Sequence, residues 1–173
     1  MSSISLHRVT PDNASFTISE VLRLIKALAL YERDPDAVEA TGERLRDAFF
    51  GDAQGRKYAE AVLAYEGGAP GEEGAQAVGM AVWFYTFSTW TGRGGLYLED
   101  LFVEESHRGK GIAKQLFNFL GKEVEARDLP RMDWVVIEWN EPAKEVYRRM
   151  GAKHMSEWQM MRLTGEPLKK LAQ

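Results

Sequence analysis

The stretch YLEDLFVEESHRGKGIAKQLFNFL, residues 97–120, changes its pattern twice along its length. Its first part belongs to an apolar segment, 94–105, that suits a β-strand. Its last part repeats apolar residues at helical spacing, namely Ile112, Leu116, Phe117 and Leu120, followed by Val124. The glycine-rich sequence RGKG, 108–111, lies between the two parts. A helix N-terminus has unpaired N–H groups and a positive dipole end, and glycines let a bulky anion approach closely. The stretch therefore predicts a strand, a phosphate-binding loop and a helix.

Two common phosphate-binding patterns do not fit this loop. A Walker loop needs an earlier glycine at a fixed distance from its lysine and a Ser or Thr after it, and Lys110 has neither. A dinucleotide-binding loop needs a third small residue and an immediate turn after the strand, whereas residues 104–108 intervene here. What remains is a short Arg-x-x-Gly-x-Ala pattern from Arg108 to Ala113. An ordinary surface turn is the open alternative.

The sequence on both sides of this stretch predicts further strands and helices. Helices are indicated over 14–34, over 41–51 between Thr41 and Gly51, and over 140–152, where Asn140 begins the helix and Pro142 lies in its first turn. Strands are indicated over 4–10, 58–66, 76–90, 94–105, 132–139 and 154–164, with a turn over 67–75. This order predicts an α/β fold with an antiparallel first half.

Length and composition limit the class of protein. A chain of 173 residues with 45% hydrophobic residues fits a single domain, which we expect to span 1–173. No apolar run approaches the ~20 residues of a membrane span and no export signal is evident, so we expect no membrane partner and a cytoplasmic location. The absence of cysteine excludes disulfides, thiolate metal sites and a cysteine nucleophile. The net charge of −4 disfavours nucleic acid and suits a cationic small molecule.

Metal and serine-hydrolase chemistry find no support in the motifs. His7, His107 and His154 are isolated, without the H-E-x-x-H spacing or another ligand pattern, so we predict no metal. No Gly-x-Ser-x-Gly elbow is present, which argues against a serine hydrolase.

The segment 97–120, together with EWNEPAKEVYRRMGA at 138–152, resembles the GCN5-related N-acetyltransferase (GNAT) superfamily. Within it, the chain is similar to the diamine (spermidine/spermine) acetyltransferase group, from VLRLIKALALYE to GEPLKKLA and most strongly between Trp90 and Gly151. The resemblance implies the GNAT fold, which is a mixed, mostly antiparallel central sheet with splayed strands flanked by helices. It also implies acetyl-CoA as cosubstrate, without a metal.

The same resemblance implies which residues bind acetyl-CoA. The pyrophosphate would be held mainly by backbone N–H groups of the loop and helix start, Arg108, Gly109, Lys110, Gly111, Ile112 and Ala113. The pantetheine arm would pair like an added strand with the backbone of Leu101, Phe102 and Val103. Asn140 would cap its helix and contact the pantetheine. At Ala143 relatives often carry serine, so one polar contact is missing.

By resemblance, the reaction is a direct attack of the amine, with Glu99 as a base acting through water and Tyr147 as the acid that protonates the CoA sulfur. A phenol with a pKa near ~10 suits a thiol leaving group. Each residue has a plainer interpretation. Glu99 and Asp100 also suit an exposed strand end, and Tyr147 also belongs to the apolar stripe of its helix.

The predicted amine site combines carboxylates and aromatic rings, which attract a cation by charge and by cation–π contact. The candidates are Glu32, Trp90, Glu99, Asp100 and Trp158, each of which also suits an ordinary surface or core position. The sequences FSTWTGRGGLYLED and TGEPLKKLA resemble the thialysine acetyltransferase branch. Ser88 stands where the polyamine branch tends to carry an aspartate, which favours a shorter amine. The resemblance also implies a homodimer in which EWQMMRLTGEPLKKLA packs or exchanges across the interface.

We therefore expect an acetyl-CoA-dependent N-acetyltransferase that acts on a small primary amine, either a thialysine- or lysine-like amino acid or a diamine. Three alternatives stay open. They are a polyamine acetyltransferase, a non-catalytic acyl-CoA-binding regulatory module, and an acetyltransferase of protein N-termini or lysines.

Overall fold

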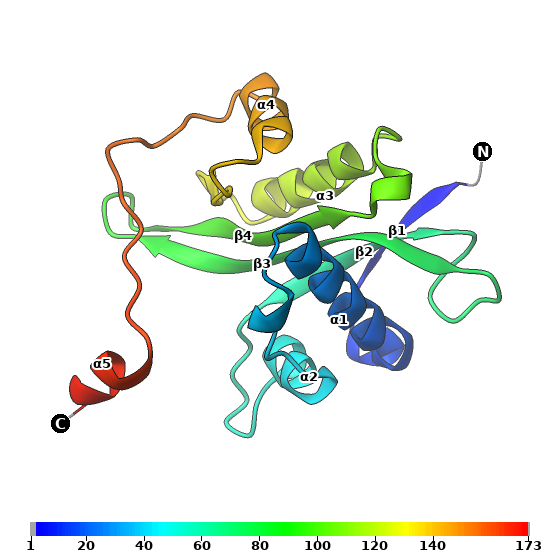
Figure 1. Ribbon diagram of the computed structural model, residues 1–173, viewed down its shortest axis with the longest axis horizontal. Helices are drawn as coiled ribbons and strands as arrows, with labels where there is room; N and C mark the ends of the chain where they lie inside the picture. Colours follow the sequence, from blue (N-terminus) through cyan, green and yellow to red (C-terminus); the bar gives the residue numbers. More distant parts are fainter. Residues whose placement is uncertain (1–2, 173) are drawn as a thin grey trace. The chain divides into compact units, whose positions relative to one another are not determined.

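A mixed sheet of five strands is the centre of the N-terminal part of the chain (Figure 1). The computed structural model describes residues 3–172. They divide into two compact units, with the boundary between Val135 and Val136, and the sheet lies in the first. Its strands are β1 (Ile4–Arg8), β2 (Glu60–Glu66), β3 (Gln76–Ser88), β4 (Arg93–Val103) and β5 (Met132–Asp133). They lie in the order β1-β2-β3-β4-β5, antiparallel throughout except for the parallel pair β4–β5. This arrangement confirms the predicted mixed, mostly antiparallel α/β sheet.

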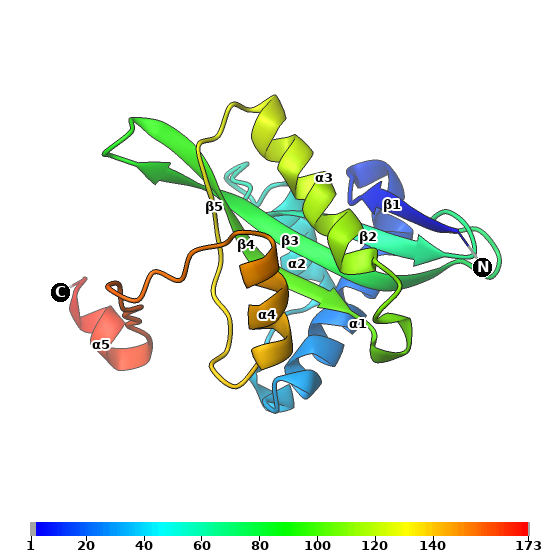
Figure 2. The same cartoon turned by 90° about the horizontal axis from the view of Figure 1, so that it is seen from above.

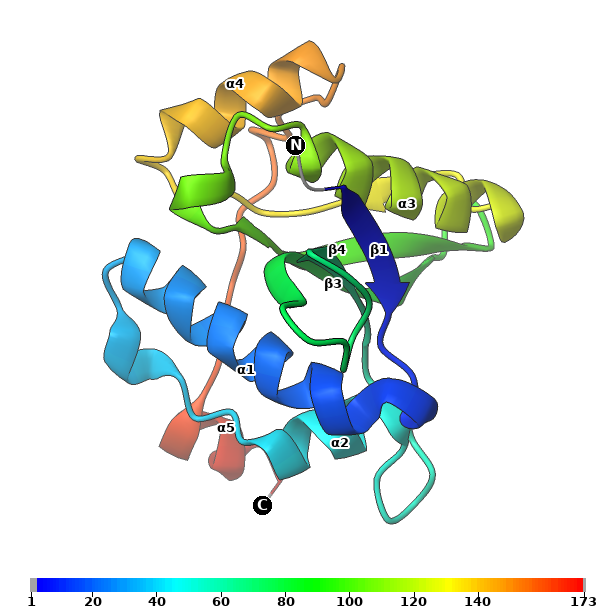
Figure 3. The same ribbon diagram turned by 90° about the vertical axis from the view of Figure 1, so that its right-hand side faces the viewer.

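Three helices cover the two faces of this sheet (Figure 2, Figure 3). α1 (Ala14–Tyr31) and α2 (Gly42–Phe50) lie on one face, and α3 (Ile112–Ala126) lies on the other. Single 3-10 turns, η1 (Pro11–Asn13), η2 (Pro35–Ala37) and η3 (Glu105–His107), precede or follow them. The amphipathic pattern of α1 explains its position, because Ile18, Val21 and Leu24 are buried against the sheet.

The core on the α1 face is apolar and continuous. It unites residues of α1 with the inward residues of the three longest strands, including Leu63, Met80 and Phe102. At the C-terminal end of β4, Phe102 belongs to this core and Val103 is also buried. The end of β4 is therefore fixed, and the loop that follows it starts from a rigid base.

Local capping occurs where the sequence predicts it. The Thr41 hydroxyl accepts a hydrogen bond from the Arg44 N–H at 3.2 Å and begins α2, and Gly51 ends it. In the second unit, α4 (Glu141–Arg149) begins at Asn140, whose side-chain oxygen accepts from the Ala143 N–H at 3.3 Å. A last short helix, α5 (Gly165–Lys170), follows near the end of the chain.

Two predicted strands are wrong. Of the predicted strand 132–139, only Met132–Asp133 forms a ladder, and residues 152–164 contain no strand at all. Both segments are apolar, but apolar character does not suffice, because a strand needs a second backbone to satisfy its N–H and C=O groups. Among residues 3–172 neither segment has such a partner beyond the two residue pairs of β5.

In the described part of the chain, no helix combines the length and the apolar character that a membrane span requires.

Candidate active site

β4 carries one residue more than its neighbour at Glu99. The register pairs Leu98 with Trp83 and Asp100 with Val82, so Glu99 has no residue opposite it on β3. Such an extra residue is a β-bulge, which bends the strand and re-aims its side chains. The simple alternation of two faces therefore does not apply across this point, and an exposed carboxylate, Glu99, lies beside a partly buried one, Asp100.

The outer edge of β4 is open beyond its first half. β5 pairs with β4 only at Leu96 and Tyr97, and no other described strand continues this ladder toward Val103. An open edge presents backbone donors and acceptors to any extended molecule that lies along it. The stretch Leu101–Val103, predicted to contact pantetheine, belongs to this open part. The Val103 carbonyl oxygen accepts a hydrogen bond from Arg108 Nε at 3.1 Å.

The loop between β4 and α3 has the backbone geometry that its two glycines permit. Gly109 and Gly111 have φ values of 76° and 79°, in the left-handed region that costs other L-residues roughly 1–2 kcal/mol. A Cβ built on either glycine meets no atom within 4 Å. Gly111 is also the N-cap of α3, and no side chain caps that helix end. The first N–H groups of this 15-residue helix therefore have no side-chain cap, which makes the helix start a favourable position for an anion.

Arg108 is held in place at the start of this loop. Its guanidinium carbon lies 4.5 Å from the centroid of the Tyr31 ring and 5.9 Å from that of Phe102. With the hydrogen bond to Val103, these contacts fix the side chain on the last turn of α1 and the end of β4. The predicted loop residues thus include one cation whose orientation is set by its neighbours.

Three carboxylates interact near the bulge. Burial, together with the charges of Glu99 and Glu32, raises the pKa of Asp100 from 3.8 to about 6. Burial also raises the pKa of Glu32, which ends α1 as its C-cap. An anion at the negative end of a helix dipole is unfavourably placed. A cationic amine beside this group would relieve both the repulsion and the poor solvation of the carboxylates.

Comparison with known proteins identifies the family. A model of the acetyltransferase (GNAT) family matches residues 25–152. The chain is 33% identical to a thialysine N-epsilon-acetyltransferase of Bos taurus, over 88% of this chain and 89% of the relative. It is 36% identical to an L-ornithine N5-acetyltransferase of Arabidopsis thaliana over 52% of this chain and 40% of that one. An integron cassette protein from the mobile metagenome of V. cholerae superposes with a TM-score of 0.74 at 26% identity, covering 99% of this chain and 98% of that one.

This chain belongs to the GNAT family. The identity over most of the chain places it in the thialysine-acetyltransferase-like branch, and it is an acetyltransferase. The predicted GNAT fold, with its mixed sheet and flanking helices, is confirmed by both the family model and the superposition.

Three predicted site residues of this GNAT protein, Asn140, Tyr147 and Trp158, lie in the second unit. Asn140 caps α4, as its sequence context predicts, and Tyr147 lies partly buried within the same helix. Their predicted contacts to pantetheine and to the CoA sulfur stay predictions. Trp158 also belongs to this unit, in the irregular segment after α4, and its side chain is 67% exposed.

In the first unit, the structure brings the predicted residues together in two groups. One is the loop group around Arg108, and the other is the carboxylate group around Asp100. Trp90 belongs to neither group, because it is 89% exposed in the turn between β3 and β4. The contribution of Trp90 to the amine site stays a prediction. Among residues 3–172 no three or more His, Asp or Glu side chains lie close enough to hold a metal ion.

The sequence did not predict a role for Tyr31. Its ring contacts the guanidinium of Arg108, which lies 77 positions later in the chain. Tyr31 lies directly before Glu32 at the end of a helix, where an aromatic residue also suits ordinary core packing. No local signal distinguishes the two roles. Arg23 and Glu104, which join α1 to the start of the loop, were missed for the same reason.

Proposed function

We propose that this GNAT acetyltransferase transfers the acetyl group of acetyl-CoA to a primary amine of a small molecule, with a thialysine- or lysine-like amino acid or a diamine as acceptor. Acetyltransferases of this family use acetyl-CoA as cosubstrate. The observation that carries the proposal is the loop before α3, where two left-handed glycines leave a helix N-terminus uncapped by any side chain.

The residues present fit the pyrophosphate of CoA. The open space over Gly109 and Gly111 leaves room for a phosphate group against the backbone. Lys110 is exposed between them and adds a positive charge. Ile112 and Ala113, the first two residues of α3, have no polar side chain that could occupy the helix end. Beyond the loop, Leu101–Val103 would take the pantetheine arm along the open edge of β4.

The proposed chemistry assigns one proton transfer to each of two residues. The cosubstrate supplies an acetyl group activated as a thioester. A C–N bond forms and the C–S bond breaks, so the neutral nitrogen must lose a proton and the sulfur must gain one, after an amine that arrives as a cation has released its extra proton to solvent. We assign the first proton to Glu99, acting through water, because it is the exposed carboxylate at the bulge. The second would come from the phenol of Tyr147.

The amine would enter as a cation attracted by Glu32, Glu99 and Asp100, with Trp90 and Trp158 adding ring contacts. A shorter amine is favoured by Ser88, because the polyamine branch tends to carry an aspartate there. Ser88 is only 8% exposed, and its hydroxyl accepts from the Thr91 N–H at 3.4 Å, so it serves the β3–β4 turn and adds no charge.

We also propose that residues 1–173 act as one N-acetyltransferase domain in a cytoplasmic homodimer that binds neither nucleic acid nor metal. The family model supports a single domain, since its match at 25–152 spans both units. The segment 157–172 is our candidate dimer element. It exposes large apolar side chains, among them Trp158, Met160, Met161 and Leu163, which a second chain would bury.

The test is an amine panel. The protein is incubated with acetyl-CoA and each of thialysine, lysine, ornithine, putrescine, spermidine and spermine, and release of free CoA thiol is measured. We expect the highest kcat/KM with thialysine or another short amine. A preference for spermidine or spermine would place the chain with the polyamine enzymes. Peptide substrates in the same assay test acetylation of proteins.

No thiol release with any amine or peptide would contradict the proposal. If CoA then still raised the thermal midpoint, the chain would be a non-catalytic acyl-CoA-binding module, since binding to the folded state alone stabilises it.

A further inference from the structure

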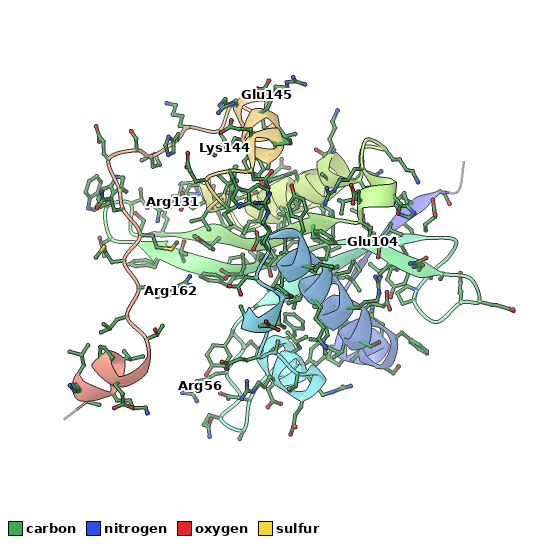
Figure 4. The ribbon with its side chains drawn as sticks, in the orientation of Figure 1. Arg56, Glu104, Arg131, Lys144, Glu145 and Arg162 are labelled. Carbon is green, nitrogen blue, oxygen red and sulfur yellow. The ribbon has the colours of Figure 1, made fainter. Side chains whose placement is uncertain are left out.

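A charged network joins α1 to the residue where β4 ends and the glycine loop begins. Arg23 of α1 donates to the Glu104 carboxylate through Nη1. The same guanidinium donates to Glu20 at 2.8 Å and to the carbonyl oxygen of Ala77 on β3. Three acceptors from three parts of the chain therefore meet at one cation. Figure 4 labels Glu104 at the end of β4, close to α1.

Arg23 forms a partly buried, hydrogen-bonded ion pair rather than an exposed surface ion pair. Burial alone would lower the pKa of Arg23, but hydrogen bonds to Glu20 and Glu104 outweigh burial and raise it. The Glu104 side chain is only 19% exposed. Partly buried, charge-assisted hydrogen bonds of this kind are stronger and more directional than exposed ion pairs.

Glu104 transmits this constraint to the loop through its own backbone. Its N–H donates to the Val78 carbonyl at 2.9 Å, and its carbonyl accepts from the His107 N–H at 2.9 Å. The other carboxylate oxygen lies 3.8 Å from His107 Nδ1. His107 Nε2 in turn lies 3.1 Å from a carboxylate oxygen of Glu66, at the end of β2. The residues before Arg108 are thus tied to α1, β2 and β3 together.

We propose that Arg23 is a positioning residue for acetyl-CoA: through Glu104 it holds the start of the loop so that the Gly109 and Gly111 backbone is arranged for phosphate before the ligand arrives. This inference rests on the proposed function. Glycine-rich segments lose much conformational freedom when they are ordered, so a loop that is already ordered binds more tightly. The role is specific to the cosubstrate, because within residues 3–172 the polar contacts of Arg23 go to Glu20, Ala77 and Glu104, none of which is assigned to the amine or to proton transfer.

The inference predicts that variants of Arg23 bind acetyl-CoA and CoA more weakly without a change in amine binding or in kcat. In Arg23→Met, which keeps the apolar stem and removes the guanidinium, KM for acetyl-CoA and Kd for CoA should rise roughly 3- to 30-fold. KM for the amine and kcat should stay within about twofold of the parent values, because a loss of uniform binding of the cosubstrate raises only KM for acetyl-CoA and leaves the chemical step untouched. Arg23→Lys should recover part of the affinity. Glu104→Gln should weaken CoA binding, and the Arg23→Met/Glu104→Gln double variant should bind no more weakly than the worse single variant.

The matched control is Arg56→Met. Arg56 pairs with Asp52 at 3.0 Å in the loop before β2, well away from Glu104 in Figure 4, so the same substitution should leave CoA binding unchanged. Kd is measured by titration calorimetry on the full chain, alongside the thermal midpoint of each ligand-free variant. Should Arg23→Met fail to fold, Glu104→Gln and Arg23→Lys carry the test.

Two failures are distinguishable. If the parent protein neither binds CoA nor releases thiol, the proposed function fails. The positioning role of Arg23 is refuted if the parent binds CoA and the folded Arg23→Met and Glu104→Gln variants bind it equally tightly. It is also refuted if, in these variants, KM for the amine rises and kcat falls by the same factor as KM for acetyl-CoA rises.

Discussion

The guanidinium of Arg108 stacks on the ring of Tyr31, with the guanidinium carbon 4.5 Å from the ring centroid. Through this contact the last turn of α1 supports the first residue of the glycine loop. The next residue, Glu32, belongs to the carboxylate group around Asp100. The end of α1 therefore touches both groups of predicted site residues, one for the anionic cosubstrate and one for the cationic acceptor.

Tyr31 should matter for the cosubstrate through its ring rather than its hydroxyl. A cation–π contact contributes about 0.5–2 kcal/mol, so Tyr31→Leu should raise KM for acetyl-CoA roughly 2- to 30-fold. Tyr31→Phe keeps the ring and should stay close to the parent enzyme. Steady-state kinetics at saturating amine measures both. An equal loss in the Phe and Leu variants would show that the stacking is not the cause.

Gly111 should resist substitution because of its backbone, not because of crowding. Its φ of 79° is strained for any other L-residue, while a Cβ would meet no atom within 4 Å. Gly111→Ala should therefore lower the free energy of unfolding by about 1–2 kcal/mol in urea denaturation. Gly121 is the control, because it lies inside α3 with equally open space and no left-handed φ. Gly121→Ala should stabilise the protein by about 0.5–1 kcal/mol. Equal effects at the two positions would contradict this explanation.

Local signals in the sequence predicted the loop and the elements around it well. The glycines at 109 and 111, the apolar stripe of α3 and the caps at Thr41 and Asn140 act within a few residues, so their geometry follows from neighbouring sequence. Contacts between distant parts of the chain carry no such signal. The stacking of Arg108 on Tyr31 and the pairing of Arg23 with Glu104 depend on how α1 crosses the sheet.

The strand predictions failed for segments that, among the described residues, have no neighbouring strand to pair with. Residues 132–139 and 154–164 have the apolar, β-branched or aromatic composition of strands, yet only Met132–Asp133 joins the sheet. Composition reports the tendency to be half-buried, whereas a ladder also requires a free backbone edge nearby. The bulge at Glu99 was missed for a related reason, because the register between β3 and β4 leaves no mark in either sequence alone.

Stability should fall with rising pH because of Asp100. Its pKa is raised from 3.8 to about 6 in the folded protein by burial and by Glu99 and Glu32. A raised carboxyl pKa means that the folded state holds the proton more tightly than the unfolded chain. The stabilising contribution is therefore complete below about pH 4 and is lost as the pH rises through about 6.

The Asp100→Asn variant removes this titration. Relative to the parent, its free energy of unfolding should increase by about 1–2 kcal/mol between about pH 4.5 and about pH 7.5. Urea denaturation at the two pH values measures the difference. Glu73→Gln, at an exposed position in the turn after β2, should show no such increase. A constant difference between Asp100→Asn and the parent across this range would show that Asp100 does not titrate there.

Tyr147 should act on the chemical step alone. If its phenol protonates the leaving sulfur, Tyr147→Phe removes that proton without changing the shape of α4, and kcat should fall roughly 10- to 1,000-fold. Kd for CoA should not change, because binding does not require the proton. Tyr58→Phe is the matched control, since the Tyr58 hydroxyl donates to Asp52 at 3.0 Å in the exposed loop before β2. Stopped-flow or single-turnover acetylation under saturating acetyl-CoA separates this step from product release. An unchanged single-turnover rate in Tyr147→Phe would remove Tyr147 from the mechanism.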